Sequence, residues 1–497
     1  MYQVARALCL TLGLAAAVLA SPATHVHQPE RQASPGAPSD SFASDRFAGI
    51  LQPCTLPDVE GSALCGGVDV WEDREATRGR KIALRVVVLP AMERPIEPDP
   101  LVYLAGGGVL PASERAPFFA RAFQELRRHR DVLLVDQRGS GGSNALDCDL
   151  PGPLDPDFRD EGRYLSAISR CRTLLEPKAD LRFYTTPHAM ADLDEVRRRL
   201  GYERLNLYGM SYGTKAAMVY LRQFPDRVRT VALHGLVPLD TSISLDTARS
   251  AQDALERVFD LCAQQPACAA AFPRLRDEFR ALMTRLAAKP VDVEVKEPSG
   301  AATTIRVDAE IVARVVHGAL YSARAIEELP RMIHRAFGGD LTPIARRASG
   351  GGYGPPKGVL LTIQCTEELP RVDPGRIAQE TAETFVGGVP LRRQLAACQR
   401  WVTGRLPEGY WSPVRSALPI LPLTGALDHA TPRHYGDHVV ATLAAARHLV
   451  LPGRGHNDVD ACVTGLIQSY VLRGSLQGLD TSCAERLEPL SFATSAD

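Results

Sequence analysis

The chain has 497 residues, of which 45% are hydrophobic and 23% are charged, and its 57 Lys and Arg residues nearly balance 58 Asp and Glu residues. This composition is that of a folded globular protein, and it excludes a disordered chain, a collagen and a multi-span membrane protein. The formal net charge of -1 provides no overall field to attract nucleic acid or an acidic membrane, so neither is expected as a partner.

The N-terminus predicts export. Arg6 precedes an apolar run over residues 7–20, and as a helix this run would rise about 21 Å, short of the roughly 30 Å hydrocarbon core of a membrane. The run ends in residues that fit the rule for signal cleavage, so we expect residues 1–20 to be a signal peptide cut after Ala20. No membrane span is expected to remain, and the product is expected to be secreted or periplasmic. Residues 21–46, rich in Ser, Pro and Ala, are predicted to be a flexible leader.

The cysteines agree with export. One of the 11, Cys9, lies in the predicted signal, and the other ten are an even number, as an oxidised framework requires. They fall as near neighbours, and we expect sequential pairing of Cys54 with Cys65, Cys148 with Cys171, Cys262 with Cys268, Cys365 with Cys398, and Cys462 with Cys483. No Cys-x-x-Cys pair and no His-Glu-x-x-His motif is present, so no zinc site, redox dithiol or cofactor is expected.

Short apolar strands alternate with helical patterns in the first part of the mature chain. Strands are predicted at 68–71, 82–89, 101–104, 132–135, 205–208 and 228–233, and helices at 118–128, 191–200 and 214–224. The first two strands are expected to form a hairpin. The alternation that follows predicts a mainly parallel, doubly wound sheet, and we assign residues 47–240 to the first part of this core.

The pattern changes after the last of these strands. Residues 241–410 are mostly helical in period, with helices expected at 251–263, 275–288 and 309–323. We interpret this segment as an inserted, mainly helical cap. Strand patterns return at 420–423 and 447–451, so residues 411–497 are assigned to the C-terminal part of the core.

The sharpest chemical signal is the motif Gly209-Met210-Ser211-Tyr212-Gly213. An apolar strand leads into it and a helical pattern leads out, which is the context of a nucleophile elbow. The turn is sharp, and a Cβ at either glycine would crowd the neighbouring strand and helix. The motif therefore predicts that Ser211 is a nucleophile held above the carboxyl end of the sheet.

A serine nucleophile needs a base, and the base needs an acid that fixes its tautomer. In this strand–turn–helix context the acid and then the histidine follow the serine along the chain. Asp428 follows the strand at 420–423, and His456 lies in a glycine-rich loop after the last strand. We assign these two residues to the triad. The remaining late candidates are explained by surface or core packing: His429, His434, His438, His448, Asp437, Asp458 and Asp460.

The reaction also needs donors for the oxyanion. One is expected to be the backbone N–H of Tyr212, and the other to come from Gly106-Gly107-Gly108, with Gly107 favoured. A phosphate-binding loop fits this segment poorly, because no G-x-G-x-x-G spacing and no Gly-Lys-Ser/Thr is present there.

Together these motifs resemble the secreted prolyl iminopeptidase and tripeptidyl aminopeptidase family of α/β-hydrolases. The resemblance also includes Asp136-Gln-Arg-Gly and Gly453-Arg-Gly-His456, and it runs from about residue 54 to the end. It implies an α/β-hydrolase fold and release of residues from the free N-terminus of peptides. In that family carboxylates in or near the cap bind the substrate's α-ammonium, and Glu367 is the candidate here. The chain has Ala105-Gly-Gly-Gly-Val109 where the family usually has His-Gly-Gly-Pro-Gly.

The prediction is therefore an exported serine hydrolase acting on a peptide or a small ester. An aminopeptidase is favoured, and a carboxylesterase with the same triad is the alternative. A non-catalytic binding protein on the same fold is a third hypothesis, which an intact Ser, Asp and His disfavours. The oligomeric state is left open by the sequence.

Overall fold

The computed structural model describes residues 46–296, 302–350 and 354–495. The predicted signal peptide and the leader up to residue 45 lie outside these residues. The strands are β1 (Leu51–Cys54), β2 (Ala63–Trp71), β3 (Lys81–Leu89), β4 (Leu101–Leu104), β5 (Val132–Val135), β6 (Leu205–Met210), β7 (Val228–His234), β8 (Val291–Lys296), β9 (Ala302–Val307), β10 (Ser416–Gly425), β11 (Leu443–Ala446) and β12 (Leu449–Leu451).

The helices of the core are α2 (Ala116–Ala122), α3 (Gln124–Arg127), α4 (Pro156–Arg159), α5 (Glu161–Leu175), α6 (Thr186–Arg199), α7 (Tyr212–Gln223), α17 (Arg433–Val440), α18 (Ala461–Arg473) and α19 (Ser482–Glu485). Those between β7 and β10 are α8 (Ile243–Gln264), α9 (Pro266–Ala271), α10 (Leu275–Ala288), α11 (Ala309–Ala319), α12 (Ala323–Phe337), α13 (Thr342–Ser349), α14 (Lys357–Ile363), α15 (Ile377–Glu380) and α16 (Val389–Cys398). Short 3-10 or π turns, η1 to η6, lie at Ser113–Arg115, Leu181–Phe183, Pro225–Arg227, Gln364–Glu368, Leu369–Arg371 and Pro374–Arg376.

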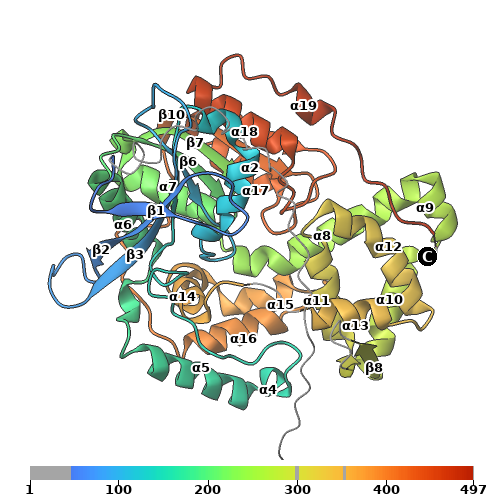
Figure 1. Cartoon of the computed structure of the whole chain (residues 1–497). Helices are drawn as coiled ribbons and strands as arrows, with labels where there is room; N and C mark the ends of the chain where they lie inside the picture. The colour runs from blue at the N-terminus through green and yellow to red at the C-terminus, as the bar shows by residue number, and fades with distance from the viewer. Residues whose placement is uncertain (1–45, 297–301, 351–353, 496–497) are drawn as a thin grey trace, which may run out of the picture. The chain divides into compact units, whose positions relative to one another are not determined.

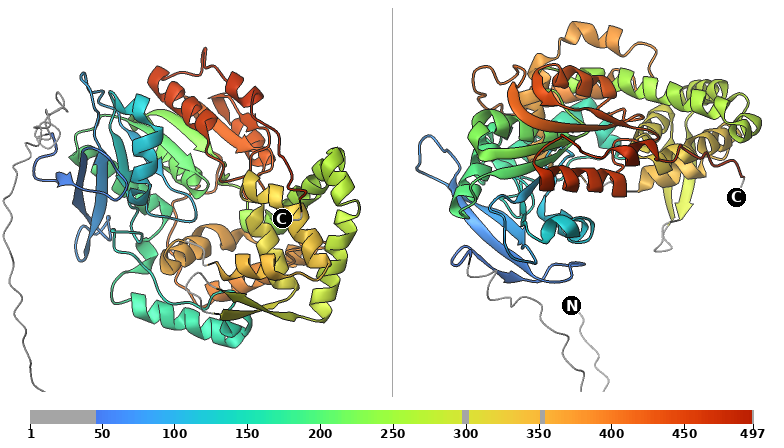
Figure 2. Two further views of the ribbon diagram at one scale, coloured as in Figure 1. Left: turned by 45° about the vertical axis from the view of Figure 1, so that its right-hand side comes forward. Right: turned by 90° about the horizontal axis from the view of Figure 1, so that it is seen from above.

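One sheet organises the core (Figure 1). Within the described residues it has ten strands in the order β1-β2-β3-β5-β4-β6-β7-β10-β11, and β12 also pairs with β10. The strands from β1 to β3 are antiparallel to their neighbours, and β5, β4, β6, β7 and β10 run parallel. Figure 2 shows this order from the blue strands at one edge to the red strands at the other. The predicted hairpin and mainly parallel sheet are confirmed.

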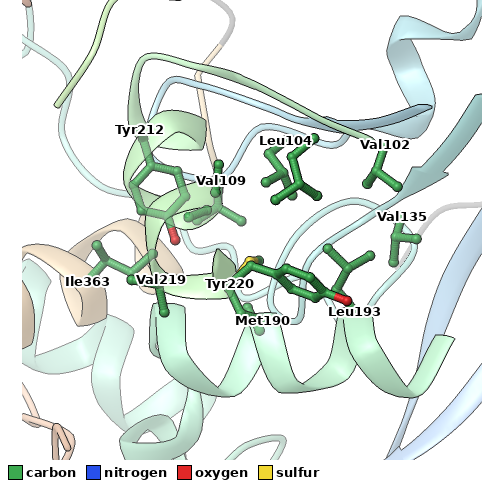
Figure 3. Packing of buried hydrophobic residues seen from close by; sticks show 14 of the residues in the cluster. Val102, Leu104, Val109, Val135, Met190, Leu193, Tyr212, Val219, Tyr220 and Ile363 are labelled. Carbon is green, nitrogen blue, oxygen red and sulfur yellow. The ribbon is translucent and has the colours of Figure 1, made fainter. Parts of the chain in front are cut away.

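Alternate side chains of the inner strands enter two different apolar cores. In β4, Val102 and Leu104 pack into one cluster, and Leu101 and Tyr103 into the other, as the two-residue period of a strand requires. The first cluster lies between the sheet and helices α6 and α7, and Met190 of α6 belongs to it (Figure 3). The second cluster lies between the sheet and helices α2 and α18. The carboxyl edge of the parallel strands is therefore flanked by two separate cores.

Several predicted elements differ in detail. The helix expected at 118–128 is two helices, because the chain leaves helical geometry at Phe123. The helix expected at 309–323 ends at Ala319, and a new one begins at Ala323. The segment at 241–410 carries the expected helices and its own apolar cluster, but it also contains the two-stranded sheet β8-β9, which the sequence did not predict.

Five disulfides join the ten cysteines of the described residues in the expected sequential order: Cys54–Cys65, Cys148–Cys171, Cys262–Cys268, Cys365–Cys398 and Cys462–Cys483. Each closes a loop of 6 to 33 residues, which limits the freedom of the unfolded chain. Among the helices that the structure describes, none combines the length and hydropathy needed to cross a bilayer.

Candidate active site

Ser211 lies between β6 and α7 in a strained turn, with φ of 55° and ψ of -124°. A residue other than glycine held there costs on the order of 1–3 kcal/mol. A Cβ on Gly209 would lie 2.4 Å from the carbonyl oxygen of Gly213, and one on Gly213 would lie 1.9 Å from that of Leu104. The turn can therefore form only with glycine on both sides, as the elbow motif predicts.

Hydrogen bonds hold the strained backbone in place. The Ser211 N–H donates to the carbonyl of His234 on β7 at 2.8 Å. The hydroxyl of Thr214 donates to the carbonyl of Ser211 at 2.6 Å and accepts from the N–H of Val237 at 2.9 Å. None of these bonds uses the Ser211 hydroxyl, which remains available for chemistry.

Asp428 and His456 form a buried pair. The strand β10 ends at Gly425, and a backbone hydrogen bond from Asp428 to Gly425 closes the turn beyond it. Nδ1 of His456 lies 2.8 Å from Oδ2 of Asp428. Thr431 donates its N–H to Oδ1 at 2.8 Å and its hydroxyl to Oδ2 at 2.7 Å. The structure therefore surrounds the carboxylate with donors.

These donors keep Asp428 ionised. Burial by itself raises the pKa of Asp428, but His456 and Thr431 together hold it below its usual range. An ionised acceptor at Nδ1 favours the tautomer with its proton on that nitrogen. Nε2 of His456 is then the free base that a serine nucleophile requires.

Ser211 and His456 line one cavity of about 900 Å³, and Asp428 binds the imidazole through Nδ1. Residues of the core and of the segment between β7 and β10 share its wall, among them Tyr103, Gly106, Gly107, Gly108, Arg115, Phe118, Tyr208, Met210, Tyr212, Lys215, His317, Tyr321, Gln364, Glu368 and Val459. In the part of the chain that the structure describes, no group of three or more His, Cys, Asp or Glu could hold a metal ion.

The expected oxyanion donors adjoin Ser211. Tyr212 is the first residue of α7, so its N–H has no partner within the helix. Gly106, Gly107 and Gly108 all line the cavity. Of the three, Gly106 packs against the nucleophile, because a Cβ on it would lie 2.9 Å from Cβ of Ser211. Gly107 has φ of +66° and faces Leu110.

Glu367 occupies a different place from the one expected. Its carboxylate is 1% exposed and accepts hydrogen bonds from Thr186 and from the hydroxyl of Tyr410. It is not among the residues that line the cavity. The next residue, Glu368, does line the cavity and forms an ion pair with Lys215 of α7. Both glutamates lie on one short π turn, Gln364–Glu368, and the sequence cannot tell which of them faces the cavity.

The other histidines near the triad have separate surroundings. His438 and His448 pair with Asp240 and Asp437, and His434 packs against the ring of Tyr435. His429 is buried, and within the described residues neither of its ring nitrogens has a hydrogen-bond partner. Burial lowers its pKa to about 3.

Sequence reasoning missed two functional neighbours of the triad. Thr431 lies two residues before α17, which starts at Arg433, and it binds Asp428. Asp458 was expected to be a surface carboxylate, but its Oδ2 accepts from the N–H of Gly455 at 2.6 Å and from that of Ala323 at 2.8 Å. Asp458 has no local signal for this role because it acts through a contact with Ala323 of a separate helix, whereas Thr431 contacts Asp428 three residues earlier in the same loop.

Comparison with known proteins decides the family. Residues 100–285 match the model described as alpha/beta hydrolase fold, and residues 384–483 match the model of TAP-like proteins. The chain is an α/β-hydrolase, and it is similar to proline iminopeptidases and tripeptidyl aminopeptidases. This α/β-hydrolase is a serine hydrolase, and its matched segments contain both Ser211 and Asp428.

Curated relatives and solved structures are similar to this chain over different lengths. The α/β-hydrolase is 24% identical over 478 residues to the serine protease Hip1 of Mycobacterium tuberculosis, covering 86% of this chain and 88% of that one. It is 29% identical over 191 residues to tripeptidyl aminopeptidase of Streptomyces lividans, covering 35% of each chain. A solved proline iminopeptidase of Mycobacterium smegmatis aligns with a TM-score of 0.39 and 17% identity, covering 83% of this chain and 99% of that one.

Proposed function

We propose that this hydrolase is an exported aminopeptidase that releases residues from the free N-terminus of peptides through an acyl-enzyme on Ser211. The observation that carries the proposal is the Asp428–His456 pair, joined at 2.8 Å, behind the cavity that Ser211 also lines. A carboxylesterase with the same triad is the alternative, because the loop Ala105-Gly-Gly-Gly-Val109 departs from that of typical family members.

In this mechanism, Nε2 of His456 takes the proton of the Ser211 hydroxyl as its oxygen attacks the substrate carbonyl. The backbone N–H of Tyr212 and an N–H of the loop at Gly106 or Gly107 bind the oxyanion. Asp428 stabilises the imidazolium, which then protonates the leaving amine. Water, deprotonated by His456, releases the acyl group and restores Ser211.

Glu368 is better placed than Glu367 to bind the substrate's α-ammonium. It lines the cavity beside Lys215, whereas both oxygens of Glu367 already accept hydrogen bonds inside the protein. A buried carboxylate attracts a cation more strongly than one in bulk water. We therefore assign recognition of the substrate N-terminus to Glu368.

Export is supported by two independent features. Residues 7–20 have the character of a signal sequence. The ten later cysteines are all paired, and such pairing persists in oxidising compartments. The signal sequence and the paired cysteines are consistent with each other, because a signal peptide delivers the chain to the compartment in which disulfides form.

A substrate panel tests the activity. The purified protein is assayed on aminoacyl and tripeptidyl arylamides with a free N-terminus, on the same compounds N-acetylated, and on short acyl esters. We expect N-free arylamides to be cleaved at least about 100-fold better than the blocked ones, which corresponds to about 2.7 kcal/mol. Cleavage of esters alone overturns the aminopeptidase. Ser211→Ala is expected to lose kcat by about 10⁴-fold or more, and the exposed Ser166→Ala is the matched control.

A second pair of variants separates the two glutamates. Glu368→Gln is expected to reduce the preference for N-free over N-acetylated substrate, with a smaller effect on esters. Glu367→Gln is expected to lower the thermal stability, since a buried acceptor of three hydrogen bonds is altered. If Glu367→Gln changes the N-terminal preference and Glu368→Gln does not, the assignment is reversed.

A further inference from the structure

The catalytic cavity extends to both sides of the sheet edge. Lys215 lies on α7 and Glu368 on the π turn, and both line the cavity. Apolar residues next to them, such as Tyr212 and Ile363, pack into the core on one face of the sheet. A second group of lining residues comes from the core on the opposite face: Tyr103, Leu110, Phe118, Tyr208, Met210 and Val459. Ser211 follows β6 and precedes α7, and we call the lining residues of each face, with the space beside them, one lobe of the cavity.

The second lobe carries a positive charge. Arg115 follows the glycine loop and lines the cavity, and its charge acts on the hydroxyls of Tyr103 and Tyr208. Within the described residues, the Arg115 guanidinium has no carboxylate partner. Arg115 is an exposed residue at the wall of the cavity, and a cation there without a carboxylate partner is suited to an anionic ligand.

Tyr208 provides an independent sign of a ligand in this lobe. Its side chain is 1% exposed, yet among the described residues its hydroxyl has no hydrogen-bond partner. Burial raises the pKa of Tyr208 well above its usual value, and the nearby Arg115 only partly opposes this. The hydroxyl therefore keeps its proton and can donate it to an acceptor in the cavity. Buried tyrosines usually have such a partner.

We propose that Arg115 and the hydroxyl of Tyr208 form a carboxylate subsite for the leaving group of the substrate. The assignment of sides rests on the proposed function: an α-ammonium at Glu368 places the acyl part in the first lobe, so the leaving part enters the second. Val459, three residues after His456, lines that lobe, which agrees with an imidazole that protonates the leaving amine. The side chains of Phe118 and Met210 provide an apolar wall beside the two polar groups.

The carboxylate can come from two sources, the free C-terminus of a short peptide or an Asp or Glu side chain after the cleaved bond. A short peptide carries an ammonium at one end and a carboxylate at the other, which matches Glu368 in one lobe and Arg115 in the other. The subsite would therefore favour short peptides or acidic residues at the first leaving position.

Matched substrates test the subsite. The acyl group that is best among the arylamides is joined to Phe as the free acid and as the amide, and to Asp amide and Asn amide. The wild type is expected to prefer one acid over its neutral partner by about tenfold in kcat/KM, and the preferred pair identifies the source. Arg115→Gln is expected to bring that ratio close to one, and Tyr208→Phe to lower it by about threefold. The exposed Arg121→Gln, on the following helix, is the control that keeps the ratio.

Equal cleavage of acid and neutral partners by the wild type overturns the subsite, as does an equal loss on both in Arg115→Gln. Failure of the proposed function gives a different result, in which no N-free peptide is cleaved. The same variants are then compared on butyrate esters of 3-hydroxybenzoate and 3-hydroxybenzamide, whose leaving groups differ only in the carboxylate. A ratio that depends on Arg115 supports the subsite there, and a ratio of one overturns it.

Discussion

The backbone N–H of Asn457 donates a 2.8 Å hydrogen bond to the carbonyl of Tyr321, and this bond joins the loop of His456 to the turn between α11 and α12. The ring of Tyr321 also packs edge-on against His456, with centroids 5.5 Å apart. Asp458 completes the junction by accepting from Gly455 in the loop and from Ala323 at the start of α12. The position of the imidazole thus depends on the segment inserted between β7 and β10.

Asp458 is a positioning residue, and Asp458→Ala is expected to show it. The change leaves two partly buried N–H groups without their acceptor, which costs about 1 kcal/mol of stability and loosens the loop of His456. We expect kcat to fall about tenfold while KM changes little, because the substrate contacts remain. Steady-state kinetics and thermal unfolding measure the two effects. Asp277→Ala, at an exposed carboxylate of α10, is the control. A change in the KM of Asp458→Ala without a fall in its kcat contradicts a positioning role for Asp458.

Thr431→Val tests the donor that faces Asp428. Valine keeps the shape and removes the hydroxyl that donates to Oδ2 at 2.7 Å. Loss of this donor raises the pKa of Asp428, so activity should disappear at a higher pH than in the wild type as the solution is acidified. We also expect kcat near pH 7 to fall by about tenfold. The pH profile of kcat measures both effects. Thr284→Val is the control. If the acid limb of the kcat profile of Thr431→Val is the same as that of the control, Thr431 does not hold down the pKa of Asp428.

Three buried histidines predict a loss of stability in mild acid. Burial lowers the pKa of His234 and of His317 to about 4 and that of His429 to about 3. In the unfolded chain each binds its proton near pH 6.5. Below that pH the unfolded state therefore holds more protons than the folded state, and the free energy of unfolding falls as the pH falls.

His429→Phe isolates one of these groups, because both ring nitrogens of His429 are unpaired among the described residues and a phenyl ring preserves the packing. Between pH 7 and pH 5 the variant should lose less stability than the wild type, by up to about 2 kcal/mol. Chemical denaturation at the two pH values measures the difference. The exposed His434→Gln should retain the wild-type slope, and an equal slope in both variants contradicts the prediction.

Gly106→Ala tests the close approach of the glycine loop to the nucleophile. The added Cβ would lie 2.9 Å from both Cβ of Ser211 and the carbonyl oxygen of Met210, so the loop or the elbow must shift. Because oxyanion donors require sub-ångström placement, we expect kcat to fall by about 100-fold or more. Rates of labelling by a fluorophosphonate probe give a second readout. Gly152→Ala, where no atom lies within 4 Å of the new Cβ, is the control.

Much of the site could be predicted because its signals are local. The sequence Gly209-Met-Ser211-Tyr-Gly213 defines its own turn, since the clashes that require both glycines involve the immediately adjacent strand and helix. Asp428 and His456 were found by their places after two late strands, because parallel strands deliver their following loops to one edge of a sheet. The role of Asp458 could not be found in this way, since it depends on a contact with Ala323 in a distant segment.

The sequence by itself determined the parallel core, the elbow at Ser211 and the short-range pairing of the cysteines, because each depends on neighbours close along the chain. Only the tertiary structure decided that Glu368 rather than Glu367 lines the cavity, since adjacent residues of one π turn point in different directions. It also decided that Arg115 and Tyr208 share a lobe of that cavity. These two residues lie far apart in the chain, and only folding of the sheet against α2 brings them together.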